Sequence, residues 1–209
     1  MYGPLDHALN CKKGGYVIRR HNMIRDMVAE LMREVCTDVK IEPALLPLAN
    51  TNLVHGNTTD NARLDVSGNG VWSPMEKTFL DIRIMHPNSP SYIKKDIQQL
   101  YRQHEKEKKR AYVERVTQVE KGSFTPFVVS TTGGMGPEAE RFLKRLAELI
   151  AEKRNEPYSC IVNYIRTRLS YCLMKSIVLS LRGVRGKRKN EEYITPVSNL
   201  SFNLIQFDE

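Results

Sequence analysis

The amino-acid sequence predicts an α/β protein in which helices pack on the faces of a small mixed β-sheet. Short runs of β-forming residues at 62–67, 77–85 and 124–131 alternate with longer stretches whose apolar residues recur at helical spacing. The chain has 209 residues, of which 41% are hydrophobic and 27% charged. It is therefore long enough for one substantial core and has the composition of a globular protein.

The first half of the chain predicts one helix and a strand hairpin. Apolar residues from Met23 to Val35 recur at helical spacing, which indicates a helix over 21–36. A short strand is expected at 39–41, before Pro43, and a polar loop at 50–61. The runs 62–67 and 77–85 flank the turn signal Ser67–Gly70, so we expect them to pair as a hairpin.

The second half predicts a long helix, a strand and two further helices. A charged helix is expected from about 91 to 120, and the apolar run at 124–131 indicates a buried strand. Pro137 suits the first turn of a helix that continues to 154, and a last helix is expected over 159–182. Gly133–Gly136 could cradle a phosphate, but they lack the lysine of a G-x4-G-K-[ST] loop, which favours a plain turn.

The charge of the chain favours a polyanionic partner. The net charge is +8 and the isoelectric point is near 9.3. Basic residues gather at 12–25, 106–115 and 182–189, which suits a phosphate backbone. A basic protein that is merely soluble is the simpler alternative.

The cysteines and the hydropathy pattern indicate the compartment. The four cysteines show no compact disulfide framework, and those at 36, 160 and 172 stand in apolar helical contexts without a histidine nearby, as structural thiols do. No secretory signal is recognised, and no window reaches the ~20 apolar residues that span a bilayer. We expect no membrane association, a reducing intracellular compartment, and the nucleus if DNA is the partner.

Two aspartates, Asp65 and Asp81, stand inside strand-like apolar runs. A carboxylate among hydrophobic residues needs an ion pair or a cation, and carboxylates on neighbouring antiparallel strands can converge on one hard divalent ion. Arg83 points to the same sheet face as Asp81, because side chains alternate along a strand. Two structural ion pairs, Arg63 with Asp65 and Asp81 with Arg83, explain the same residues without catalysis, and spacing alone favours that alternative.

A more specific pattern extends beyond these two strands. It comprises, in chain order, His7-x3-Cys11, Arg20-His21-Asn22, Arg63-Leu64-Asp65, Asp81-x-Arg83, Lys108-x3-Tyr112 and Thr125–Gly134. The series covers about residues 7–150 and resembles the restriction-like endonuclease domain of site-specific non-LTR retrotransposons. The chain also looks like remnants of mobile elements in animal genomes. The resemblance implies a PD-(D/E)XK, restriction-endonuclease-like core: a mixed sheet of about four strands flanked by helices.

The resemblance also implies roles for individual residues. Asp65 and Asp81 would ligate Mg²⁺ or Mn²⁺, and Glu30 could supply a further acid. Lys108 and Tyr112 share a helix face and would contact the phosphate, although a solvated helix face explains them equally well. The residue at the catalytic-lysine position is Arg83, and the residues expected to contact DNA are Arg20, His21, Asn22, Arg25, Arg63 and Lys109.

Three positions depart from the family pattern. Leu64 stands in place of proline, Asn22 in place of aspartate, and Arg83 in place of the lysine of the (D/E)XK motif. Arginine keeps its positive charge but cannot accept a proton at ordinary pH. Either Lys108 therefore takes over the catalytic-lysine role, or activity is weak or absent.

The resemblance divides the chain into three parts. These are a zinc-knuckle remnant with a basic segment at 1–20, an endonuclease-like domain at 21–182 and a basic, partly ordered tail at 183–209. His7 and Cys11 match the second half of a small zinc site whose first Cys-x2-Cys is missing, so no bound zinc is expected. Two incidental residues are the alternative.

The expected function is a metal-dependent endonuclease that nicks target DNA for retrotransposon integration by target-primed reverse transcription. Its partners would be DNA, a reverse transcriptase domain in cis and element RNA, with no small-molecule substrate. Arg83 motivates the alternative of a nuclease fold that binds DNA without catalysis. An unrelated structural or protein-interaction domain would show no salt-sensitive binding of nucleic acid.

Overall fold

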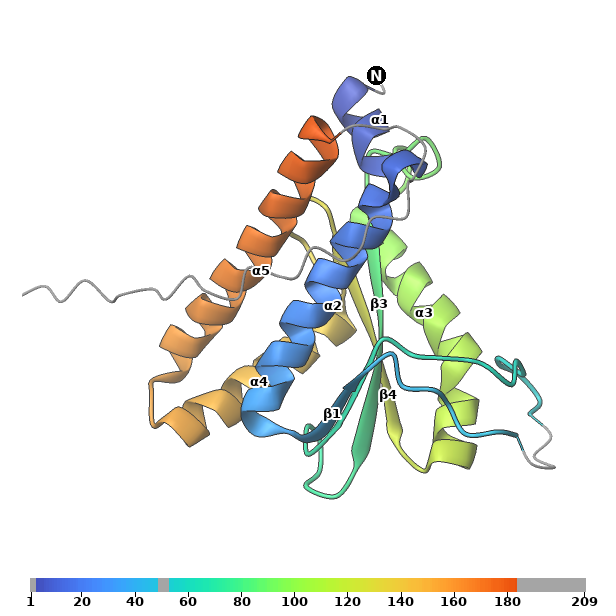
Figure 1. The fold of residues 1–209 in the computed structure, drawn as a ribbon, viewed down its shortest axis with the longest axis vertical. Coiled ribbons are helices and arrows are strands. Elements are labelled where there is room, and N and C mark those ends of the chain that lie inside the picture. Colours follow the sequence, from blue (N-terminus) through green and yellow to red (C-terminus); the bar gives the residue numbers. More distant parts are fainter. Residues whose placement is uncertain (1–2, 49–52, 184–209) are drawn as a thin grey trace, which may run out of the picture.

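The computed structural model describes residues 3–48 and 53–183. A four-stranded mixed sheet flanked by helices forms its core (Figure 1), which confirms the predicted α/β class. The elements are, in chain order, α1 (Pro4–Asn10), α2 (Tyr16–Val35), β1 (Thr37–Ile41), β2 (Val66–Asn69), β3 (Lys77–Met85), α3 (Ile97–Arg115), β4 (Ser123–Ser130), α4 (Pro137–Arg154) and α5 (Tyr158–Arg182). The tail predicted from 183 onward lies, after Gly183, outside the described residues.

The sheet has the strand order β1-β2-β3-β4. β2 pairs antiparallel with β3, with Val66 opposite Leu80, which confirms the predicted hairpin. β3 and β4 pair in parallel up to Met85 and Ser130, because α3 carries the chain back along the sheet before β4 begins. β2 has four residues and β3 has nine, so the edge of β3 beyond Leu80 continues after β2 has left it.

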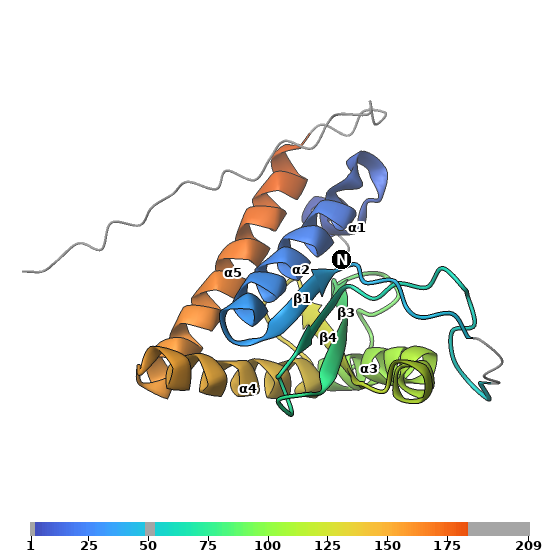
Figure 2. The same ribbon diagram turned by 60° about the horizontal axis from the view of Figure 1, so that its bottom comes forward.

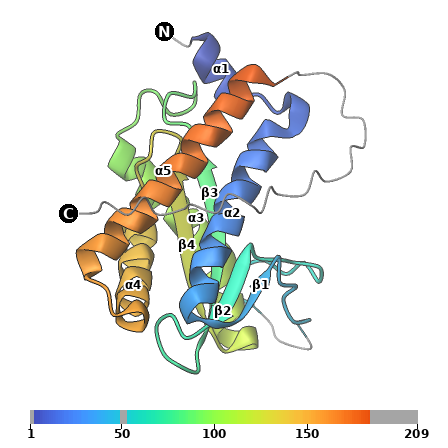
Figure 3. The ribbon, with the colours of Figure 1, turned by 60° about the vertical axis from the view of Figure 1, so that its left-hand side comes forward.

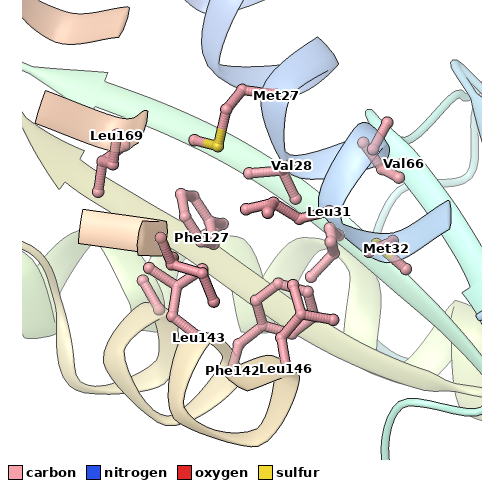
Figure 4. Close-up of a cluster of buried hydrophobic side chains, with 14 of the residues drawn as sticks. Met27, Val28, Leu31, Met32, Val66, Phe127, Phe142, Leu143, Leu146 and Leu169 are labelled. Atoms are coloured by element: carbon pink, nitrogen blue, oxygen red, sulfur yellow. The ribbon is translucent and has the colours of Figure 1, made fainter. Parts of the chain in front are cut away.

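Helices α2, α4 and α5 bury one face of the sheet. Figure 4 shows how Leu31 of α2 and Phe142 of α4 point toward Phe127 of β4 in the main hydrophobic cluster, to which Leu80 and Ile82 also belong. Figure 2 shows α2 and α5 running beside each other, with α4 below them at the side of the sheet. The residues of β3 that alternate with Leu80 and Ile82 therefore cannot face this core.

Helix α3 covers the other face of the sheet. Leu100 and Tyr101 pack there against Met85 and Val128 in a separate cluster. Since Met85 faces α3, the side chains at alternate positions before it on β3 lie on the same side. This parity brings Asp81 within reach of α3.

Helix α2 begins at Tyr16, earlier than the predicted start at 21. Tertiary contacts that periodicity cannot reveal stabilise its first turns. Arg20 is 3% exposed, and its Nη1 and Nη2 each donate to the carbonyl of Leu9 at 3.2 Å. His86 ties α1 down as well, since it contacts Oδ1 of Asp6 at 2.9 Å. The segment before 21 is thus packed onto the sheet-bearing part of the chain.

Helix α3 begins at Ile97 rather than near 91. Asp96 is its N-cap, and its side chain accepts a hydrogen bond of 2.9 Å from the amide of Gln99. An aspartate cap of this kind fixes the first turn of a helix. The helix ends at Arg115 and continues as a π-helical turn at Val116–Glu120, so its end is close to the prediction.

The turn expected at Ser67–Gly70 is wrong, because β2 runs through Gly68 and the chain turns only after Asn69. A Cβ atom at Gly68 would lie 2.9 Å from Cε of Met32 and 3.1 Å from Cγ2 of Val39. The glycine therefore permits the close approach of α2 to the sheet and does not mark a turn.

A buried arginine is one of the residues that hold the long connection between β1 and β2 against α3. The Arg115 side chain is fully buried, and it donates to the carbonyls of Leu46, Asn57 and Thr59 at 3.0, 2.9 and 2.7 Å. Three carbonyl acceptors compensate for the burial of the guanidinium. The clamp fixes the course of the segment that leads into Asp65.

Candidate active site

The candidate site lies where β2 leaves β3. β2 begins at Val66, which pairs with Leu80. The residue before it is Asp65, whose amide donates to the Leu80 carbonyl at 3.0 Å. Beyond that point the amide and carbonyl of Ile82 on the same edge bind side chains in place of a strand. The peptide edge of β3 thereby orients the groups around it.

Asp65 is anchored by that free edge. Its Oδ2 accepts a hydrogen bond of 2.5 Å from the amide of Ile82 and lies 3.2 Å from Nε2 of His21. Burial raises the pKa of Asp65, but the hydrogen bond and charge of His21 and the Ile82 amide outweigh it, so the pKa falls below its ordinary value. Asp65 is therefore a carboxylate at neutral pH.

Asp81 sits beside Asp65 and faces α3. Nζ of Lys108 lies 2.6 Å from its Oδ2, and the side chain is only 10% exposed. Burial raises the pKa of Asp81 to about 6, the charge of Lys108 opposes this rise, and the neighbouring Asp65 adds to it. The two carboxyl groups thus interact directly, as the sequence predicted for a pair on neighbouring strands.

His21 contacts Asp65, and Asn22 contacts His21. Nε2 of His21 also lies 3.2 Å from the carbonyl of Ile82, and Nδ1 lies 3.5 Å from Oδ1 of Asn22. Burial lowers the pKa of His21, but the hydrogen bond and charge of Asp65 raise it above its ordinary value. His21 bridges α2 to the strand edge, because its Nε2 contacts both the Asp65 carboxylate and the Ile82 carbonyl, and it thereby orients the carboxylate.

Lys108 and Tyr112 share one face of α3, as their spacing indicates. Nζ of Lys108 lies 6.0 Å from the centroid of the Tyr112 ring. That ring packs at 5.6 Å against Phe124, in the small cluster that contains Phe79 and Val116. Tyr112 therefore forms an apolar support beneath the lysine, which limits the directions its ammonium can take.

Arg83 faces α3 but does not reach the aspartates. Its Nη1 pairs with Oε2 of Glu107 at 2.8 Å, and Nδ1 of His104 lies 3.4 Å from the same oxygen. Burial and the charge of Arg83 lower the pKa of His104, which is therefore neutral at neutral pH. Glu107 was not predicted as part of the site. Its position directly before Lys108 in the sequence is the one signal that could have indicated it.

The structural ion pairs that offered an alternative explanation do not form. Asp65 pairs with His21 and Asp81 pairs with Lys108, whereas Arg83 pairs with Glu107. Arg63 is exposed and forms no ion pair with the described residues. The ion pairs of Asp65, Asp81 and Arg83 are therefore formed with residues of α2 and α3, and not between residues of the two strands.

Several residues predicted for the site lie elsewhere. Glu30 is exposed and pairs with Arg168 of α5, so it is not brought to the aspartates. Arg20 is committed to the Leu9 carbonyl, and Arg25 is 9% exposed and pairs with Asp26 and Glu42. Lys109 pairs with Glu138 at the start of α4. Periodicity on a helix cannot predict the partners of Glu30 and Lys109, because Arg168 and Glu138 come from distant parts of the chain.

The donor set suits a hard divalent cation. Oδ2 of Asp81 is buried, and Nζ of Lys108 lies 2.6 Å from it. Residues 3–48 and 53–183 contain no group of three His, Cys, Asp or Glu side chains that could hold a metal. Asp65 and Asp81 are the two residues that would ligate such a cation, as in Mg²⁺ sites that complete their shell with water and phosphate oxygens.

His7 and Cys11 lie one helical turn apart at the N-terminal end. The amide of Cys11 bonds to the His7 carbonyl at 2.9 Å, His7 is exposed and Cys11 is partly buried. Two ligands are too few for a structural zinc site, which takes four. That no zinc is bound by this pair stays a prediction.

Comparison with known proteins adds no family. No protein-family model matches the chain, and no curated protein matches it in sequence. Within the described ranges, no helix is long and apolar enough to cross a membrane.

Proposed function

We propose that this chain is a metal-dependent DNA endonuclease with a restriction-endonuclease-like core. The observation that carries the proposal is the meeting of the buried Asp81 carboxyl group and the partly buried Asp65 carboxyl group with one lysine at the edge where β2 leaves β3. Such an arrangement has little structural purpose, because burying two carboxyl groups side by side costs free energy. A cation beside a phosphodiester would relieve that cost.

Each residue has a role in this proposal. Asp65 and Asp81 would hold Mg²⁺ or Mn²⁺, and the ion would activate a water molecule and neutralise charge on the phosphate. His21 holds Asp65 in position, and Tyr112 supports Lys108. Lys108 then serves as the cation that stabilises the reacting phosphate, a role that Arg83 cannot fill while it pairs with Glu107.

The substrate class follows from charge. The net charge of +8 favours a polyanion, and Arg63, His21 and Arg83 are at least partly exposed near the aspartates. The resemblance to retrotransposon endonuclease domains suggests nicking of target DNA in the nucleus, beside a reverse transcriptase domain and element RNA. Arg20 and Arg25 are not included among the DNA contacts, because they are buried and paired.

A DNA-binding module without catalysis is the second candidate. It is favoured by one observation, the engagement of Arg83 with Glu107 at the position where the family pattern has its lysine. In that case the protein would bind DNA with a steep dependence on salt but would not cut it. The two candidates differ only in the chemistry of the site.

Nicking of supercoiled plasmid by the purified chain, with Mg²⁺ or Mn²⁺ and with EDTA, tests the proposal. We expect relaxation that requires the metal and is lost in Asp65→Asn and in Asp81→Asn. Asp60→Asn is the matched control, since this exposed aspartate lies in the same connection and has no ion pair among the described residues. Metal-dependent nicking that persists in both site variants would reject the assignment of endonuclease activity to Asp65 and Asp81. Salt-sensitive DNA binding without nicking would support the binding module.

A further inference from the structure

The outward side of α5 carries an apolar stripe that no described residue covers. Tyr171, Met174, Val178 and Leu181 are 62%, 62%, 39% and 47% exposed. We call these four residues the α5 surface. Their spacing of three, four and three residues is that of a coiled-coil seam, and it lies opposite the buried positions, which include Leu173 and Ser176. Figure 3 shows α5 as the outer helix beyond α2 and α4.

A cavity of about 740 Å³ adjoins the same helix. Tyr101, Met135, Leu143 and Leu169 contribute to its mostly apolar lining. Ser170 also lines it, and Met174 follows Ser170 by one helical turn, so the hollow leads onto the α5 surface. A cavity of this volume can accept a large side chain from a partner.

The charged residues of α5 itself have one sign, and Glu140 of α4, which lines the cavity, pairs with Lys144. α5 contains no aspartate or glutamate, and its cations include Arg166, Lys175 and Arg182. None of these three cations forms an ion pair with the part of the chain that the structure describes; Lys175 lies over the Tyr171 ring, and Arg166 lines the cavity.

We propose that the α5 surface and the adjoining cavity bind an amphipathic helix of another protein whose apolar seam is flanked by acidic residues. Charge complementarity selects this partner, because acidic flanks would neutralise cations that lack a partner on α5. A second copy of this chain would oppose cation to cation across a symmetric contact. The proposal is independent of the endonuclease site, which lies on the α3 side of the sheet.

Other macromolecules fit the surface less well. The phosphates of a nucleic-acid backbone could contact the cations, but burying the apolar stripe against phosphates would contribute no binding energy. A lipid surface would engage the stripe but could not fill the hollow beside it. The cavity therefore argues for a side chain projecting from a structured partner.

Two labelled peptides of about three heptads, with leucine at a and d, test the proposal. One carries glutamate at e and g and the other carries lysine there. Fluorescence anisotropy with the full chain should show that the glutamate peptide binds at least roughly tenfold more tightly than the lysine peptide. The double variant Met174→Glu/Val178→Glu should lose this binding, whereas Met75→Glu, at a residue 92% exposed in the β2–β3 connection, should keep it.

A second variant guards against misfolding. Arg166→Glu/Lys175→Glu changes only exposed charges, and it should reverse the preference toward the lysine peptide. The proposal is overturned if the glutamate peptide fails to bind, if both peptides bind equally, or if the Met174/Val178 variant binds as before. It is also overturned if anionic vesicles or duplex DNA displace the glutamate peptide at equal mass, or if sedimentation shows a dimer that the Met174/Val178 variant abolishes.

Discussion

Nζ of Lys108 on α3 lies 2.6 Å from Oδ2 of Asp81 on β3, in the gap left where β2 departs from the sheet. The contact places a cation against the one carboxyl group whose pKa burial raises to about 6. It neutralises a charge that the interior would otherwise reject. The same ammonium would face a phosphate that approached the two aspartates.

Replacing Lys108 by methionine should raise the pKa of Asp81 further above 6, because the charge of the lysine is what lowers it. The titration of the Asp81 carboxyl carbon, followed by NMR, measures this change. Lys106→Met is the control, since Lys106 is an exposed lysine on the same helix with no ion pair among the described residues. An unchanged Asp81 titration in Lys108→Met would contradict the ion pair.

Arg83 and Lys108 should contribute very differently to cleavage. Lys108→Ala is expected to reduce the nicking rate by about a hundredfold or more, the cost of losing one charge-stabilising group. Arg83→Ala should change it by less than about fivefold, because Arg83 is held by Glu107 away from the carboxylates. Single-turnover nicking rates with Mn²⁺ compare the two variants. The reverse order of effects would return the catalytic role to Arg83.

The raised pKa of Asp81 predicts stability that falls as pH rises from 4 toward 6. The folded chain retains the Asp81 proton there while the unfolded chain, with an ordinary pKa of 3.8, has lost it. The rise to about 6 corresponds to about 3 kcal/mol in the free energy of unfolding. The lowered pKa of Asp65 acts below this range and the raised pKa of His21 acts above it.

Urea unfolding of the wild type and of Asp81→Asn between pH 4 and 6.5 measures this contribution. The variant cannot titrate at residue 81, so the difference in free energy of unfolding between the two proteins should change by a few kcal/mol across the range. Buried Glu105, whose pKa burial also raises, contributes equally to both proteins and cancels. Parallel curves would show that Asp81 titrates normally.

The clamp formed by Arg115 should contribute strongly to stability. Arg115→Met leaves the carbonyls of Leu46, Asn57 and Thr59 without the donor that the buried guanidinium supplies, and it should lower the free energy of unfolding by about 3 kcal/mol. Arg110→Met, at an exposed arginine of the same helix, should change it by less than about 0.5 kcal/mol. Equal urea midpoints for the two variants would exclude the clamp as a stabilising feature.

The sequence determined the secondary structure and the parity of the strands. Periods of two and of 3.6 residues are local, so the strands β3 and β4 and the helices α4 and α5 could be predicted close to their bounds. The antiparallel partner of β3 was also predicted, but at 62–67, whereas β2 spans Val66–Asn69. The same alternation placed Asp81 and Arg83 on one face of β3. The convergence of Asp65 and Asp81 followed from the antiparallel pairing of their strands.

Only the tertiary structure decided which partner each charged side chain takes. Lys108 reaches Asp81 and Glu107 takes Arg83, although the spacing along β3 suggested a contact between the two β3 residues. Glu30 of α2 pairs with Arg168 of α5, which the local sequence pattern also did not predict. Ion pairs between distant segments depend on how helices dock on the sheet, and packing at positions such as Gly68 sets that docking. A local sequence pattern does not contain information on how helices dock on the sheet.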